Sequence, residues 1–175
     1  MLYNKGGQTA AFELSVKLYL FFILFFFNDL SLLHCNIRSL YKNIDKLEEI
    51  VTPCSKPPDI IALSETRIKE TSIIATLPGY NFINENSQTQ AGGVGAYIKN
   101  NLKYLQRRDL QFKIHGCENI WLEILGKRQK IIIGIVYRHP QYNIDRFSQP
   151  FSETTAKIEK NICVLCIRRY YHKSI

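Results

Sequence analysis

A short apolar run that ends in a carboxylate constrains this chain more than any other stretch of its sequence. Residues 59–66 read Asp-Ile-Ile-Ala-Leu-Ser-Glu-Thr and follow Lys56-Pro57-Pro58. Such a run between turn-forming residues is typical of a strand buried in a sheet. Burying a lone carboxylate is costly, so Glu65 must face solvent, a partner cation or a metal ion.

The length and composition allow one ordinary domain with a polyanionic partner. The chain has 175 residues, of which 46% are hydrophobic, which is too apolar for a disordered chain. Its net charge of +8 suits nucleic acid. The five cysteines are an odd number without repeated spacing, which argues against a disulfide framework. We therefore expect a reducing compartment, nuclear or cytoplasmic, and a nucleic acid as the partner.

Residues 1–29 differ from the rest of the sequence. Residues 18–27 are apolar and rich in aromatic side chains, but this run is too short to span a bilayer. Three interpretations compete: a signal or anchor, a buried segment, and an appended leader unrelated to the domain. No small-residue cleavage site follows the run, which weakens the signal-peptide interpretation. We expect the appended leader, because a regular pattern begins only near Leu30, and a membrane location is the less favoured alternative.

From Leu30 onward, short apolar runs alternate with turn residues. Residues 42–52 show helical spacing of apolar side chains, and residues 146–160 suggest a second helix in which Pro150 lies in the first turn or causes a kink. Gly126-Lys127 reads as a hairpin turn. The pattern predicts an α+β fold with helices outside a largely β core, and its strands are expected over residues 30–35, 59–65, 80–83, 94–98, 102–110, 120–125, 130–137 and 162–167.

Polar side chains stand where three of these strands end. Asn36 follows the first strand, Glu65 the second, and Tyr137-Arg138 a later one. If the strands are neighbours, these residues meet at one rim of the sheet, where active sites often gather. Mg²⁺ prefers oxygen ligands, so Glu65 is a candidate metal ligand. Asn36, Tyr137 and Arg138 can donate to a phosphate, which indicates phosphodiester hydrolysis.

The order of these segments resembles the endonuclease/exonuclease/phosphatase superfamily, and most of all the endonuclease domain at the front of non-LTR retrotransposon polyproteins. The resemblance covers residues 30–166. It is carried by His34-Cys35-Asn36-Ile37-Arg38-Ser39-Leu40, Pro58-Asp59-Ile60-Ile61-Ala62-Leu63-Ser64-Glu65-Thr66, Pro78-Gly79-Tyr80, Gly92-Gly93-Val94 and Val136-Tyr137-Arg138-His139-Pro140.

The resemblance implies a four-layered α/β sandwich, in which two mainly antiparallel sheets pack face to face with helices outside. It also implies a Mg²⁺-dependent nuclease that nicks DNA to leave a 3′-hydroxyl for reverse transcription. By position, Asn36 is similar to the family's active-site asparagine, Glu65 to its metal-binding glutamate and Tyr137 to the tyrosine that contacts the scissile phosphate. Arg138 belongs to the same block and is grouped with the catalytic residues.

The sequence departs from the family pattern after residue 166. The family continues with Gly-Asp-x-Asn, whereas this chain reads Ile167-Arg168-Arg169-Tyr170. We therefore expect a partial sandwich that lacks its C-terminal third, a basic and unstructured tail over residues 167–175, and a catalytically incomplete site.

Two other functions remain open. The first is a DNA-binding remnant that does not cut, using a basic surface that includes Lys103, Arg107, Arg108, Lys127, Arg128 and Lys130. The second keeps the superfamily but takes a phospholipid or other phosphomonoester as substrate, which the Asn-Ile-Arg-Ser-Leu and Tyr-Arg-His-Pro blocks make less favoured. No protein partner is predicted.

Overall fold

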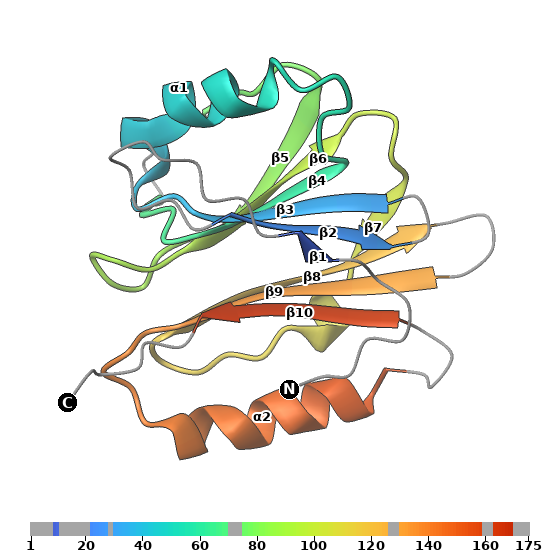
Figure 1. Cartoon of the computed structure of the whole chain (residues 1–175). Coiled ribbons are helices and arrows are strands. Elements are labelled where there is room, and N and C mark those ends of the chain that lie inside the picture. The colour runs from blue at the N-terminus through green and yellow to red at the C-terminus, as the bar shows by residue number, and fades with distance from the viewer. Residues whose placement is uncertain are drawn as a thin grey trace.

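The computed structural model describes residues 30–69, 75–125 and 130–158 in full, and the backbone of three further strands at residues 9–10, 22–27 and 163–169. Figure 1 shows four layers: α1, a first sheet, a second sheet and α2. The predicted α+β class and the partial sandwich with outer helices are confirmed.

The first sheet has six strands in the order β1-β2-β3-β4-β6-β5. Only β3 and β4 run parallel, and the other pairs are antiparallel. The parallel pair is joined by the crossover through α1, so both strands end at the same rim of the sheet. The bounds are β1 Thr9–Ala10, β2 Phe22–Phe27, β3 Leu30–Asn36, β4 Ile60–Ser64, β5 Tyr80–Glu85 and β6 Val94–Lys99.

The second sheet has four strands in the order β10-β9-β8-β7. The antiparallel pair β8 and β9 forms its centre, and β10 runs parallel to β9 after the crossover through α2. A 3-10 turn, η1, follows the short strand β7. The bounds are β7 Tyr104–Gln106, η1 Arg108–Leu110, β8 Cys117–Leu125, β9 Lys130–Arg138 and β10 Cys163–Arg169.

Each helix covers the outer face of one sheet (Figure 1). The helix α1, Leu40–Val51, buries Leu40, Leu47 and Val51 against the first sheet. The helix α2, Ile144–Ala156, buries Phe147 against Trp121 of the second sheet. Apolar residues at helical spacing thus form one buried stripe on each helix.

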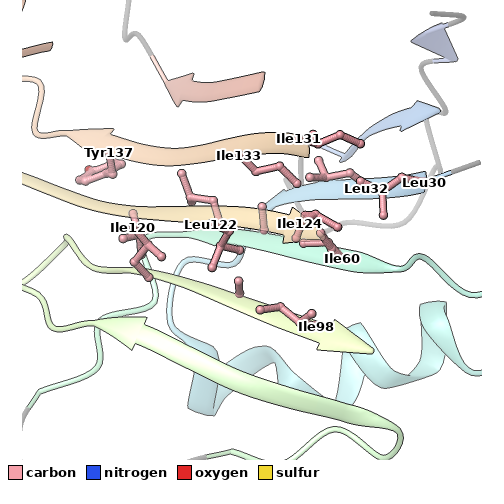
Figure 2. Close-up of a cluster of buried hydrophobic side chains, with 14 residues drawn as sticks. Leu30, Leu32, Ile60, Ile98, Ile120, Leu122, Ile124, Ile131, Ile133 and Tyr137 are labelled. Atoms are coloured by element: carbon pink, nitrogen blue, oxygen red, sulfur yellow. The ribbon is translucent and has the colours of Figure 1, made fainter. Parts of the chain in front are cut away.

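The space between the sheets is filled by alternate side chains of both. Leu32 and Ile60 come from the first sheet, and Ile120, Leu122 and Ile133 from the second (Figure 2). Because side chains alternate across a strand, the residues between them face the helices instead. The inner faces of the two sheets therefore form one dry core, which fixes the sheets relative to each other.

Residues 22–27 of the aromatic run form the strand β2, which pairs with β3 of the first sheet. The strand β2 pairs with residues 30–35 of β3, from Phe22 opposite Cys35 to Phe27 opposite Leu30. The physical reason is that β3 has two hydrogen-bonding edges and β4 occupies only one of them. A neighbouring run of β-prone residues satisfies the exposed edge.

Other boundaries differ from the sequence-based ones by smaller amounts. The strand expected over residues 102–110 is a short edge strand followed by the turn η1. Pro150 lies beyond the first turn of α2, so the first-turn interpretation is wrong. The strand β10 continues to Arg169 and so includes the first three residues of the expected tail, while the Gly126-Lys127 turn and residues 170–175 lie outside the described residues.

The inter-sheet core yields a test of stability in one strand. Leu122 is completely buried between the sheets, whereas Leu125 on the same strand is 42% exposed. We expect Leu122→Ala to lower the free energy of unfolding by about 2–5 kcal/mol, through lost burial and the cavity left behind. Leu125→Ala, the matched control, should change it by about 0.5 kcal/mol or less. Urea unfolding measures both, and equal effects of the two substitutions would contradict the face-to-face packing.

Candidate active site

The loops that follow β3 and β4 have an unusual backbone. Four residues other than glycine adopt a positive φ in the described part of the chain: Arg38 at 49°, Ser39 at 108°, Glu65 at 56° and Arg67 at 55°. Such conformations cost of order 1–3 kcal/mol each and persist only where the surroundings enforce them. All four lie within three residues of the end of β3 or β4, which marks this rim as a constrained site.

Hydrogen bonds enforce this backbone from two sides. The amide of Ser39 donates to Glu65 O at 2.8 Å, and that of Leu40 donates to Thr66 O at 2.9 Å, which continues the pairing of β3 with β4. On the other side, the amide of Arg67 donates to Gly92 O at 2.9 Å. The loop after β4 is therefore fixed between the loop after β3 and the loop before β6.

Asn36 and Glu65 form a buried hydrogen-bonded pair at this rim. The Nδ2 of Asn36 donates to Glu65 Oε1 at 2.8 Å, and its Oδ1 accepts from the amide of Arg38 at 3.2 Å. Asn36 is fully buried and Glu65 is 4% exposed. Both ends of the Asn36 amide are thus engaged within the protein, so this side chain orients the Glu65 carboxylate.

Glu65 and Tyr137 line the same cavity although they come from different sheets. This Glu65 cavity has a volume of about 300 Å³, and its wall is formed by Arg38, Glu65, Arg67, Ala91, Tyr137, His139 and Pro140. Tyr137 belongs to the inter-sheet core (Figure 2). It is the last residue but one of β9, and from there it contributes to the cavity wall. One carboxylate and two guanidinium groups at one opening suit a cation together with an anionic ligand.

Arg138 does not join this group. Side chains alternate along β9, so Arg138 lies on the outer face with Val136 while Tyr137 faces the first sheet. Its Nη1 donates to the carbonyl oxygens of Tyr142 and His139. The structure therefore brings together Asn36, Glu65 and Tyr137 of the predicted site residues, and places Arg138 at a different cavity.

Three residues that line the Glu65 cavity were missed by the sequence-based prediction. They are Arg38, Arg67 and His139. Each follows a predicted site residue by two positions: Asn36, Glu65 and Tyr137. Residues two positions apart lie on the same face of an extended strand, so the sequence indicated that His139 would lie on the same side as Tyr137.

A second buried carboxylate lies close to the site. Glu118 on β8 is the cross-strand neighbour of Tyr137 and is 1% exposed. Its Oε1 accepts from the amide of Gln88 at 2.9 Å, whereas its Oε2 is buried without a hydrogen-bond partner. A Cβ at Gly92 would come within 2.6 Å of Oε1, so only glycine allows this approach.

Burial raises the pKa of Glu118 above its usual value, against the opposing effect of the hydrogen bond from Gln88. The sequence carried a signal for this residue, because Glu118 occupies the same strand phase as Ile120, Leu122 and Ile124 of the core. A carboxylate in a core-facing phase is an exception that a strand pattern reveals.

A metal ion at this rim would have few protein ligands. In the described residues no group of three or more His, Cys, Asp or Glu side chains surrounds a common point. Mg²⁺ can bind through one carboxylate while it keeps several waters and contacts substrate phosphate. A single preoriented carboxylate at an open cavity meets that minimum, and it would hold the ion weakly.

Part of the expected basic surface is already neutralised. Arg107 forms ion pairs with Asp109 at 2.7 Å and Glu123 at 2.6 Å, and Lys130 reaches Glu123 at 3.2 Å. These hydrogen bonds raise the pKa of Arg107 and lower that of Asp109. Lys127 and Arg128 lie outside the described residues.

Neither helix in the described part of the chain is long and apolar enough to cross a membrane.

Comparison with solved structures identifies the fold. The endonuclease domain of TRAS1, a telomere-specific non-LTR retrotransposon, is similar with a TM-score of 0.54 and 14% sequence identity, over 76% of this chain and 56% of that one. A 3′-5′ exonuclease from Neisseria meningitidis gives a TM-score of 0.41 at 10% identity, over 75% and 54% of the two chains. A 3′ phosphatase from Neisseria bound to product DNA hairpin gives 0.33 at 14% identity, over 56% and 38%.

No family model and no curated protein matches this sequence. The likeness to the retrotransposon endonuclease domain shows that this chain shares the fold of that domain. This chain spans about half the length of that domain's structure, 56%.

The buried Glu118 predicts a pH-dependent stability. A carboxyl group whose pKa is raised by folding leaves the protein most stable below its unfolded pKa, and that stability is lost as the pH rises through the folded pKa. We expect Glu118→Gln to raise the melting temperature at neutral pH, because it removes a buried charge. The difference in melting temperature between the variant and the unmodified chain should shrink toward acidic pH, where Glu118 is protonated. Thermal melts across pH measure this, with exposed Glu85→Gln as the control. A pH-independent difference would contradict the assignment.

Proposed function

We propose that this chain carries a phosphodiester-hydrolysing site of the nuclease type, which acts on DNA with Mg²⁺ at Glu65. The observation that carries the proposal is the shared cavity. A carboxylate oriented by Asn36 lies with Tyr137 and two arginines at the rim between two packed sheets. This combination supports metal and phosphate bound side by side.

Glu65 would hold the metal ion, with water and the phosphate as further ligands. A Mg²⁺ ion there supplies polarisation of a phosphoryl oxygen and stabilisation of developing charge. Asn36 acts as a positioning residue, because its amide contacts the carboxylate and the loop backbone. The strained backbone at Glu65 keeps the ligand in place before the ion arrives.

The cationic and hydroxyl side chains of the cavity would bind the phosphate. Arg38 and Arg67 flank Glu65 on the two constrained loops, and a guanidinium can bind a phosphate with two parallel hydrogen bonds. Tyr137 adds a hydroxyl donor from the second sheet. The ring of His139 also lines the cavity, where an imidazole nitrogen can form a further hydrogen bond.

The proposed site is weak as a catalyst. From residue 167 the sequence reads Ile167-Arg168-Arg169-Tyr170 where the family has Gly-Asp-x-Asn, so the residues that position the attacking water in the family are missing at this point. Among the described residues, Glu65 alone contributes a carboxylate to the wall of the Glu65 cavity. Both facts favour a second candidate function, in which the chain binds DNA without cutting it.

Replacing the proposed metal ligand separates the two functions. We expect Mg²⁺-dependent nicking of a supercoiled plasmid by the unmodified chain, and a fall to background with Glu65→Gln, because the amide has no charge to hold the ion. The exposed Glu85→Gln should leave nicking unchanged. Equal nicking by the unmodified chain and Glu65→Gln would reject this role of Glu65. DNA binding without nicking by the unmodified chain would favour the binding function.

Metal binding itself can be followed without catalysis. We expect Mn²⁺, used as a paramagnetic substitute, to broaden amide resonances of the loops at residues 36–39 and 65–67. Asn36→Ala should weaken this binding about 10–100-fold, as the loss of an outer-shell partner usually does. Asn43→Ala on α1 is a control that also removes a side-chain amide near these loops. Unchanged Mn²⁺ affinity in Asn36→Ala would contradict the positioning role.

A further inference from the structure

A second cavity lies on the outer face of the second sheet, at the start of α2. This α2 cavity has a volume of about 220 Å³, and Arg138, Tyr142 and Arg146 contribute to its wall. The phosphodiester site proposed above does not use it. Arg138 and Tyr137 are consecutive in β9 and face opposite sides of the strand, so the two cavities flank the same strand end.

The guanidinium of Arg138 is buried with a donor left over. Arg138 is 9% exposed, and its Nη1 is held by the carbonyl oxygens of Tyr142 and His139. Its Nε is buried without a hydrogen-bond partner. No carboxylate in the described part of the chain forms an ion pair with it. A buried charge in this state is costly, and an anion in the cavity would offset the cost.

The rest of the wall is also suited to an anion. Arg146 and His115 are exposed at its edge, and none of the lining residues is acidic. Burial raises the pKa of the Cys117 thiol to about 12, so this side chain stays neutral beside Arg138. Asn143 caps α2 by accepting from the amide of Asp145 at 2.7 Å. The positive end of the helix dipole therefore also lies at the cavity.

A row of aromatic rings joins the two cavities. Tyr137 contacts His139 at a centroid distance of 6.5 Å, His139 contacts Tyr142 at 5.6 Å, and Tyr142 contacts His115 at 4.8 Å, all edge to face. The Tyr142 ring fits only because residue 116 is glycine, since a Cβ there would lie 2.1 Å from the ring. The surface between the cavities is thus built from packed rings and bears no acidic side chain in this row.

We propose that the α2 cavity is a second phosphate-binding subsite, which takes a neighbouring backbone phosphate of the same DNA strand that occupies the Glu65 cavity. This inference rests on the proposed function for the identity of the ligand. Each DNA strand carries one phosphate per about 3.4 Å of axis, so a strand lying over the ring row presents further phosphates within a few nucleotides. Arg138 then binds the substrate away from the reacting phosphate.

The ¹⁵N resonance of Arg138 Nε–H reports directly on the subsite. We expect inorganic phosphate, added without metal or DNA, to shift this resonance, and a short single-stranded DNA to shift it as well. Arg146→Gln should weaken phosphate binding at least about tenfold, the value of a charge-assisted hydrogen bond. The substitution is at an exposed position, so it leaves the fold intact. An unmoved Arg138 resonance with both probes would overturn the proposal.

DNA affinity as a function of salt provides the second arm. Arg146→Gln should reduce the slope of log affinity against log salt by about one, as expected for one lost phosphate contact. Lys157→Gln is the matched control, because it removes one exposed positive charge at the opposite end of the same helix. Equal slopes for the two variants would overturn the subsite.

The two arms also separate this inference from the proposed function. The phosphate arm needs neither Glu65 nor Mg²⁺, so loss of nicking in every preparation would leave its result unaffected. A shift with phosphate but none with DNA would overturn the nucleic-acid assignment. Shifts with both probes in a chain that never nicks would support the subsite and reject hydrolysis.

Discussion

The apolar contact between the two sheets is the interaction on which the rest of the structure depends. Leu32 and Ile60 from one sheet meet Ile120, Leu122 and Ile133 from the other (Figure 2). This contact sets the distance between the ends of β4 and β9, and only for that reason do Glu65 and Tyr137 reach one cavity. The site is thus assembled by hydrophobic packing although its members are polar. Weakening the core would move Glu65 and Tyr137 apart even if neither residue was substituted.

Much of the fold and part of the site could be predicted from local pattern. The run before Glu65 is short, apolar and preceded by two prolines, which predicts a buried strand with a carboxylate at its end. The parallel pairing of β3 and β4 then brings Asn36 to Glu65, as the strand-end argument requires. The alternation of side chains along a strand also predicts that Tyr137 and Arg138 face opposite sides of the sheet. The two were nevertheless grouped, because they are adjacent in one sequence block.

The remaining features depend on contacts between distant segments, which local pattern does not encode. Nothing in residues 22–27 shows that β3 has an unoccupied edge, so their pairing with it was missed. Arg107 carries the same charge in the sequence as any other arginine, yet the fold places it between Asp109 and Glu123. The strand phase of Glu118 indicates that it faces the core, but the approach of Gly92 to its carboxylate depends on the fold.

The left-handed backbone at Arg38 and Arg67 has a consequence for how this chain can change over evolutionary time. Glycine and asparagine adopt that conformation more readily than arginine, so backbone energetics alone favour replacing both side chains. Those replacements would relieve strain and remove the positive charges around Glu65 together. Backbone energetics and the positive charge of the Glu65 cavity therefore act in opposite directions at these two positions.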